Sequence, residues 1–157
     1  INQISVIIGK TAALCIRGFL QCVIILGLAM LLFGVTVQGS LLLAFFMLLL
    51  GIFSFIGLGI LAISMSGDQA SGTMIVNLLM FPMIFLGGVF YPIQQMPGFM
   101  QTISQFIPLT YAADAMRKII LLNAGIGDVL YQMVILIGFG VVTMAIAVPL
   151  FRKSMTR

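Results

Sequence analysis

Charged residues are scarce in this chain of 157 residues, at 6%, and histidine is absent altogether. A soluble domain carries about a quarter of its residues as Asp, Glu, Lys and Arg. Hydrophobic residues instead make up 62% of the chain, so we expect hydrocarbon rather than water to surround most of it. Without histidine, the chain can form neither a histidine-dependent catalytic triad nor a histidine-bound zinc site.

The other elements of catalysis are equally sparse. The three acidic residues are Asp68, Asp114 and Asp128, and Asp68 is expected on the opposite side of a membrane from the other two. The run Gly9-Lys10-Thr11 has only the tail of a phosphate-binding loop, without its leading glycine. Cys15 and Cys22 are seven residues apart in one apolar run, about 10 Å along a helix, which is too far for a disulfide. We therefore predict no enzyme, and no catalytic, metal or cofactor site in this chain.

Four long apolar runs predict the fold class, an all-α polytopic bundle of transmembrane helices forming one domain over residues 1–157. Each run has about the 20 residues that a helix needs to cross a bilayer. Gly51, Gly57 and Gly59 in the second run are a weak indication of close helix contact. Arg17 lies inside the first run, where it either extends its side chain to the membrane surface or contacts a partner or substrate pathway. The expected spans are 11–34, 41–64, 72–91 and 129–151.

Between the third and fourth spans, residues 96–121 predict an extracellular pair of amphipathic helices. Pro97 is expected as the first helical residue and Pro108 as the end of the first helix. A second helix is expected from Thr110, with Asp114 in its first turns and Arg117 toward its end. The apolar residues at helical spacing in the first helix are Met96, Phe99, Met100, Ile103, Phe106 and Ile107.

The charges predict the orientation of the chain. Four spans place both ends on one side, and positive residues gather on the cytoplasmic side of membrane proteins. We therefore expect both ends in the cytoplasm and the helix pair outside. No basic patch interleaved with aromatics is present, so nucleic acid is not expected as a partner. The side that carries the whole excess of +4 holds Lys10, Arg17, Asp68, Arg152, Lys153 and Arg157.

Two runs carry a resemblance to a known family. LGGVFYPIQQMP, followed by PLTYAADAMR, resembles the signature of the membrane subunits of type-2 ATP-binding-cassette (ABC) transporters. The runs IIGK and GLGILAISMSGDQA also match that family, in the same order along the chain. The matching positions in the two signature runs are Gly87, Gly88, Phe90, Tyr91, Pro92, Pro97, Pro108, Leu109, Thr110, Tyr111 and Arg117.

The resemblance implies a permease subunit of an ATP-driven exporter of drugs, lipids or polysaccharides in the bacterial inner membrane. Such a subunit works by alternating access with a second permease copy, among membrane lipids, while separate ATPase subunits hold ATP and Mg. The family has six spans, and this sequence resembles the third to the sixth, so we expect the first two spans and most of the coupling helix to lie outside it. The alternative is a non-transporting membrane assembly or immunity protein, or an inactive truncated permease fragment.

The same resemblance suggests two groups of site residues. The first group would form an outer gate, or merely pack the top of the bundle. Gly87-Gly88 is either a flexible joint or a close helix contact, and Asp114 either forms an exposed ion pair with Arg117 and Lys118 or links to a neighbouring subunit. The second group, a candidate cytoplasmic contact, is Lys10, Asp68 and Gln69, of which the last two could instead form an ordinary turn. The gate group is Gly87, Gly88, Pro92, Pro97, Phe99, Ile103, Pro108, Tyr111, Asp114 and Arg117.

Overall fold

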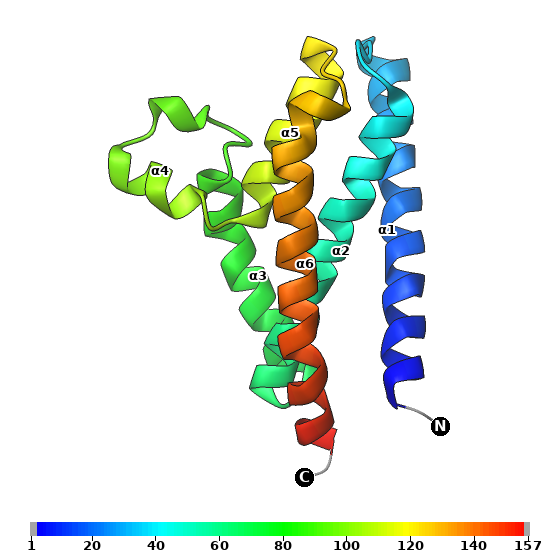
Figure 1. Ribbon diagram of the computed structural model, residues 1–157, viewed down its shortest axis with the longest axis vertical. Coiled ribbons are helices and arrows are strands. Elements are labelled where there is room, and N and C mark those ends of the chain that lie inside the picture. The colour runs from blue at the N-terminus through cyan, green and yellow to red at the C-terminus, as the bar shows by residue number, and fades with distance from the viewer. Residues whose placement is uncertain (1–2, 156–157) are drawn as a thin grey trace.

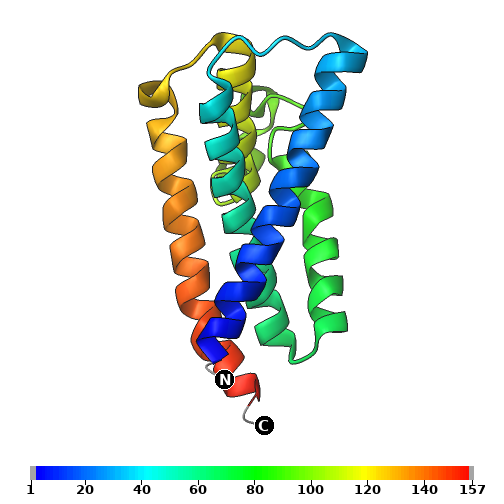
Figure 2. The same ribbon diagram turned by 90° about the vertical axis from the view of Figure 1, so that its right-hand side faces the viewer.

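The computed structural model describes residues 3–155, which form helices joined by short turns (Figures 1 and 2). This described part contains no strand, and four of its helices are long and apolar enough to cross a membrane. The predicted fold class is therefore confirmed. The elements are α1 (Gln3–Phe33), α2 (Leu41–Ser66), α3 (Gln69–Leu86), the 3₁₀ turn η1 (Ile93–Gln95), α4 (Gly98–Ser104), α5 (Pro108–Leu122) and α6 (Ile126–Met155).

Several helix boundaries differ from those expected. Helix α1 begins eight residues before position 11 because no proline interrupts the chain there. Helix α3 ends at Leu86 rather than at position 91, since the next residues form a turn in which Gly88 has a φ of 76°. The turn between α2 and α3 consists only of Gly67, in the left-handed conformation, and Asp68, which caps α3. Pro82 lies inside α3, as expected.

Helix α2 is the centre of the bundle, and four other helices pack on it. Each of these contacts involves a glycine. Gly18 of α1 faces Ile52, and a Cβ added to Gly72 of α3 would lie 2.6 Å from the Cα of Ile63. Lipid tails are as apolar as leucine, so helices in a membrane associate through close van der Waals packing at small residues. The remaining two contacts on α2 are Gly51 against Ala112 of α5 and Gly57 against Thr143 of α6.

The most extensive packing between two helices is that of α2 with α6. The Ser54 hydroxyl of α2 is fully buried and donates a hydrogen bond of 2.8 Å to the carbonyl oxygen of Leu136 in α6. Gly140 of α6 lies under the Phe53 ring, where an added Cβ would come within 2.5 Å of the ring carbons. Of the glycines expected at contacts, Gly51 and Gly57 are confirmed, whereas Gly59 has nothing within 4 Å of its Cβ position.

Helix α5 packs on both α2 and α6. Ala115 and Ile119 are fully buried. The turn that joins α1 to α2 is fixed to α5, because the Gln38 N–H donates to the Ile120 carbonyl at 2.9 Å. The adjacent Gly39 packs against the Ile119 backbone. The amphipathic pattern in this region therefore marks a helix whose apolar face packs against protein.

Helix α4 is shorter than its pattern predicts. It covers only Gly98–Ser104, so Met96 and Ile107 lie outside it. Pro97 is the capping residue rather than the first helical residue. Pro108 does not end α4 but begins α5, where its missing N–H costs nothing. The prediction that the second helix starts at Thr110 was therefore wrong by two residues.

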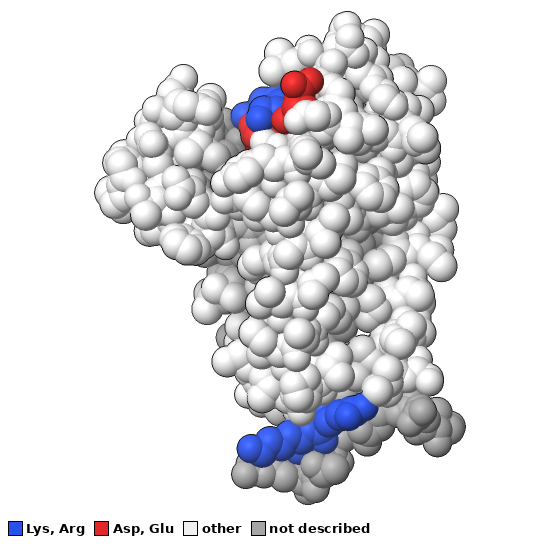
Figure 3. All heavy atoms as spheres, in the orientation of Figure 1, with Lys and Arg blue, Asp and Glu red and all other residues white. Residues whose placement is uncertain are grey.

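The two chain ends lie at one end of the bundle, called here the terminal end (Figures 1 and 2). The α1–α2 and α5–α6 turns lie at the opposite end, called here the far end. Figure 3 shows Lys and Arg at the terminal end and a mixed acidic and basic cluster near the far end, with no charge between them on this face. Arg157 lies outside the described residues. This distribution agrees with four crossings, while the side of the membrane that each end faces stays a prediction.

The α2–α6 contact makes a testable prediction about two glycines of one helix. Gly140→Leu forces a side chain into the Phe53 ring, and such overpacking costs about 1–3 kcal/mol. Gly138→Leu is the matched control, because nothing lies within 4 Å of its Cβ position. Thermal unfolding of the purified protein in detergent should show a clearly lower midpoint for Gly140→Leu than for the control. Equal midpoints would contradict the packing described.

Candidate functional site

The joint between α3 and the segment that follows it is held by α5. Gly88 adopts a φ of 76°, which favours glycine. Its carbonyl oxygen accepts a hydrogen bond of 2.8 Å from Nη2 of Arg117. A Cβ added to Gly87 would lie 3.2 Å from the Leu109 side chain. The structure thus brings Gly87, Gly88 and Arg117 together in a close contact.

Beyond this joint, η1 and α4 form a projection beside α3 (Figure 1), called here the cap. Pro92 precedes η1 and Pro97 precedes α4, so each proline marks the start of a short helix. The Phe99 side chain is 69% exposed and that of Ile103 is 47% exposed. The cap therefore presents apolar side chains outward.

Two hydrogen bonds connect the end of α4 to the start of α5. The Thr110 hydroxyl donates to the Ser104 carbonyl at 2.8 Å, and the Tyr111 hydroxyl donates to the Gln105 carbonyl at 2.6 Å. The Tyr111 ring also meets Tyr131 of α6 edge-on, with ring centroids 6.1 Å apart. Together with the buried Pro108, these contacts fix the base of the cap to the bundle.

Asp114 joins α5 to α6 of the same chain. It pairs with Lys118 at 3.0 Å and accepts a hydrogen bond of 2.6 Å from the Gln132 amide nitrogen. Arg117 turns instead to Gly88, so the expected pairing of Asp114 with Arg117 does not form. Gln132 is 4% exposed and was missed by the sequence analysis. The sequence feature that could have identified Gln132 is its position as a single amide side chain in an otherwise apolar part of α6.

At the terminal end, the three predicted cytoplasmic contact residues Lys10, Asp68 and Gln69 line one hollow of about 450 Å³. Thr11 and Phe151 also line it. Asp68 accepts a hydrogen bond of 2.8 Å from the Ser71 N–H, and this bond lowers the pKa of its carboxyl group. Asp68 thus lies in the turn between α2 and α3 and caps α3, while also lining the hollow.

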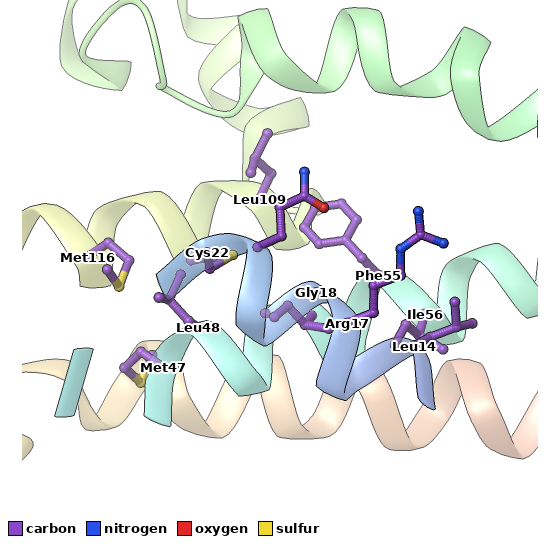
Figure 4. A pocket seen from close by; sticks show the side chains of 14 residues that line it. Leu14, Arg17, Gly18, Cys22, Met47, Leu48, Phe55, Ile56, Leu109 and Met116 are labelled. Carbon is purple, nitrogen blue, oxygen red and sulfur yellow. The ribbon is translucent and has the colours of Figure 1, made fainter. Parts of the chain in front are cut away.

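A second hollow, of about 580 Å³, is an open groove between α1, α2 and α5 (Figure 4). Met47 and Met116 lie at one end of the groove, and Leu14 and Ile56 lie at the other. The lining is apolar apart from Arg17, Gln21 and the thiol of Cys22. The sequence singled out Arg17 but could not show that three helices surround it.

A bundle of four membrane-length helices with a short helical cap defines a multi-pass membrane protein. The profile of the family described as "ABC-2 type transporter" matches residues 2–121. The chain therefore belongs to the ABC-2 type transporter family, as the two signature runs indicated.

Three relatives illustrate the similarity. The chain is 26% identical over 150 residues to the "Probable multidrug ABC transporter permease YbhR" of Escherichia coli strain K12, covering 96% of this chain and 41% of the relative. It is 29% identical over 100 residues to the "Daunorubicin resistance ABC transporter permease protein DrrB1" of Streptomyces coeruleorubidus, covering 64% and 34%. It is 31% identical over 81 residues to "Nodulation protein J" of Rhizobium leguminosarum bv. viciae, covering 52% and 31%.

The chain thus spans about two fifths of the length of the first of these relatives. No solved structure matches the chain. Two of these three relatives carry names that describe them as ABC transporter permeases.

The joint at Gly88 makes a second prediction. Arg117→Gln removes a charged donor, and a hydrogen bond to a charged group contributes about 1.5–3 kcal/mol. Amide hydrogen exchange over residues 87–97 should therefore become at least about tenfold faster. Lys118→Gln, which removes the same charge from the next residue, should leave that segment unchanged. Equal exchange in both variants would mean that Arg117 does not hold the joint.

Proposed function

We propose that this chain is the membrane-spanning part of a permease subunit in an ATP-driven exporter. The observation that carries the proposal is the family match over residues 2–121, which covers the first three membrane-length helices, the cap and most of α5. Separate ATPase subunits would bind ATP and Mg and supply the energy. The relatives named for multidrug transport and daunorubicin resistance favour lipophilic cargo.

In this proposal two permease copies face each other in the inner membrane and alternate access to a cleft between them. Both ends of the chain lie in the cytoplasm, which the positive charge at the terminal end supports (Figure 3). The ATPase would contact the terminal end, where Lys10, Asp68 and Gln69 gather around one hollow. A hollow lined by both charge signs and an amide suits a polar protein segment.

The cap would act as the outer gate. It packs on α3, and the hydrogen bonds of Thr110 and Tyr111 tie its base to α5. A shift of α3 relative to α5 would therefore move it. Its exposed Phe99 and Ile103 would cover the exit for apolar cargo when the gate is closed.

Transport in membrane vesicles tests the proposal. The full-length protein of the open reading frame is co-expressed with the ATPase encoded beside it. We expect the two to co-purify and the vesicles to move a lipophilic dye only when ATP is present. An ATPase variant without its phosphate-binding lysine is the control and should abolish movement. A protein that binds no ATPase and moves no dye would instead be a non-transporting membrane protein.

The gate has its own test. Cysteines at Phe99 and at Leu86, the last residue of α3, are joined by a reducible bifunctional reagent in a Cys15→Ser, Cys22→Ser background. Export should fall at least about tenfold on crosslinking and recover on reduction, because the cap can no longer move on α3. The single Phe99→Cys variant should export at the same rate before and after the same treatment. Unimpaired export by the crosslinked protein would remove the gating role and leave the transporter proposal standing.

A further inference from the structure

Arg17 is a charged side chain without a carboxylate partner in the described part of the chain. Asp68 caps α3, Asp114 pairs with Lys118, and Asp128 accepts a hydrogen bond from the Gly125 N–H. These are the three acidic residues of the sequence. A lone charge on a membrane helix is costly and normally finds a counter-charge or reaches water. Any anion that faces Arg17 therefore comes from outside the acidic side chains of these 157 residues.

The depth of Arg17 limits which anion this can be. Arg17 lies 16 residues before Phe33, the last residue of α1, and so about 24 Å from it along the helix. The hydrocarbon layer is about 30 Å thick. Side chains on a helix lean toward its N-terminus, so the guanidinium extends toward the boundary of the layer on the terminal side. Phospholipid phosphates lie at this boundary.

The groove beside Arg17 has the shape that a lipid tail requires. From Ile56 near Arg17 to Met47 at the opposite end, it follows nine residues of α2, or about 14 Å. Figure 4 shows the Arg17 side chain beside the Phe55 ring, with Leu109 of α5 facing them and Met116 toward the far end. The groove thus runs from the level of the head groups toward the middle of the membrane.

We propose that the groove between α1, α2 and α5 binds an anionic phospholipid of the leaflet at the terminal end. The guanidinium of Arg17 holds the phosphate, for which its planar set of donors is well suited. The amide of Gln21, one helical turn further along the same face, meets the ester region. One acyl chain lies along Leu48, Phe55 and Met116. The lipid would fill one side of α1, whose most apolar 18-residue stretch has no buried residue in the described structure.

Lipid titration monitored by native mass spectrometry tests this proposal on the full-length protein. Delipidated protein in detergent is mixed with dioleoyl-phosphatidylglycerol or with dioleoyl-phosphatidylcholine, which carries no net charge. We expect the first bound phosphatidylglycerol to be preferred about tenfold, a difference of about 1.4 kcal/mol. Arg17→Gln should abolish this preference, and Arg17→Lys should keep most of it. Inorganic phosphate at the same concentration should not compete, because it has no acyl chain.

Lys10→Gln is the matched control. It removes one positive charge from the same helix, two turns before Arg17 and outside the groove. This variant should keep the preference for phosphatidylglycerol. An equal loss in Lys10→Gln and Arg17→Gln would show diffuse attraction to the terminal end and would overturn the site. An unchanged preference in Arg17→Gln, accompanied by loss of the second copy or another subunit, would overturn it in favour of a protein carboxylate.

Discussion

The architecture depends on how closely backbones approach one another around α2. Four helices pack on this helix, and each contact includes a glycine. A Cβ added at that glycine would either clash with the neighbouring helix or lie in van der Waals contact with it. In hydrocarbon the hydrophobic effect does not drive helices to associate, so close packing and a few buried hydrogen bonds must supply the attraction. The Ser54 hydroxyl donates one such bond to the Leu136 carbonyl, beside the contact of Gly140 with Phe53.

The packing around α2 determines where the joint, the groove and the hollow at the terminal end lie. Because α5 packs on both α2 and α6, its Arg117 can reach the joint that follows α3 and its Leu109 can close one side of the groove. The cap then projects from a fixed base. At the other end, the two-residue turn between α2 and α3 places Asp68 and Gln69 beside Lys10 of α1. The joint at Gly88 and the hollow beside Lys10 therefore lie at opposite ends of α3.

Much of the fold could be predicted because hydrophobic length alone identifies membrane helices. The same reasoning could not position α5. Its amphipathic pattern is equally compatible with a membrane surface and with a protein surface, and only the contacts of Ala115 and Ile119 with other helices decide between them. Proline position was also ambiguous, since Pro108 could end one helix or begin the next. Gln132 and the groove at Arg17 depend on which helices are neighbours, which no local pattern contains.

The central claim, that α5 packs on α2 at a glycine, is tested most directly by a disulfide. A Cβ at Gly51 would lie 3.5 Å from the Cβ of Ala112, within the range that a disulfide spans. In a Cys15→Ser, Cys22→Ser background, Gly51→Cys with Ala112→Cys should oxidise rapidly in native membranes. Gly59→Cys with Ala112→Cys should stay reduced, since Gly59 has nothing within 4 Å of its Cβ position. A reduced 51–112 pair, or equal oxidation of both pairs, would contradict the position of α5 on which the joint and the groove depend.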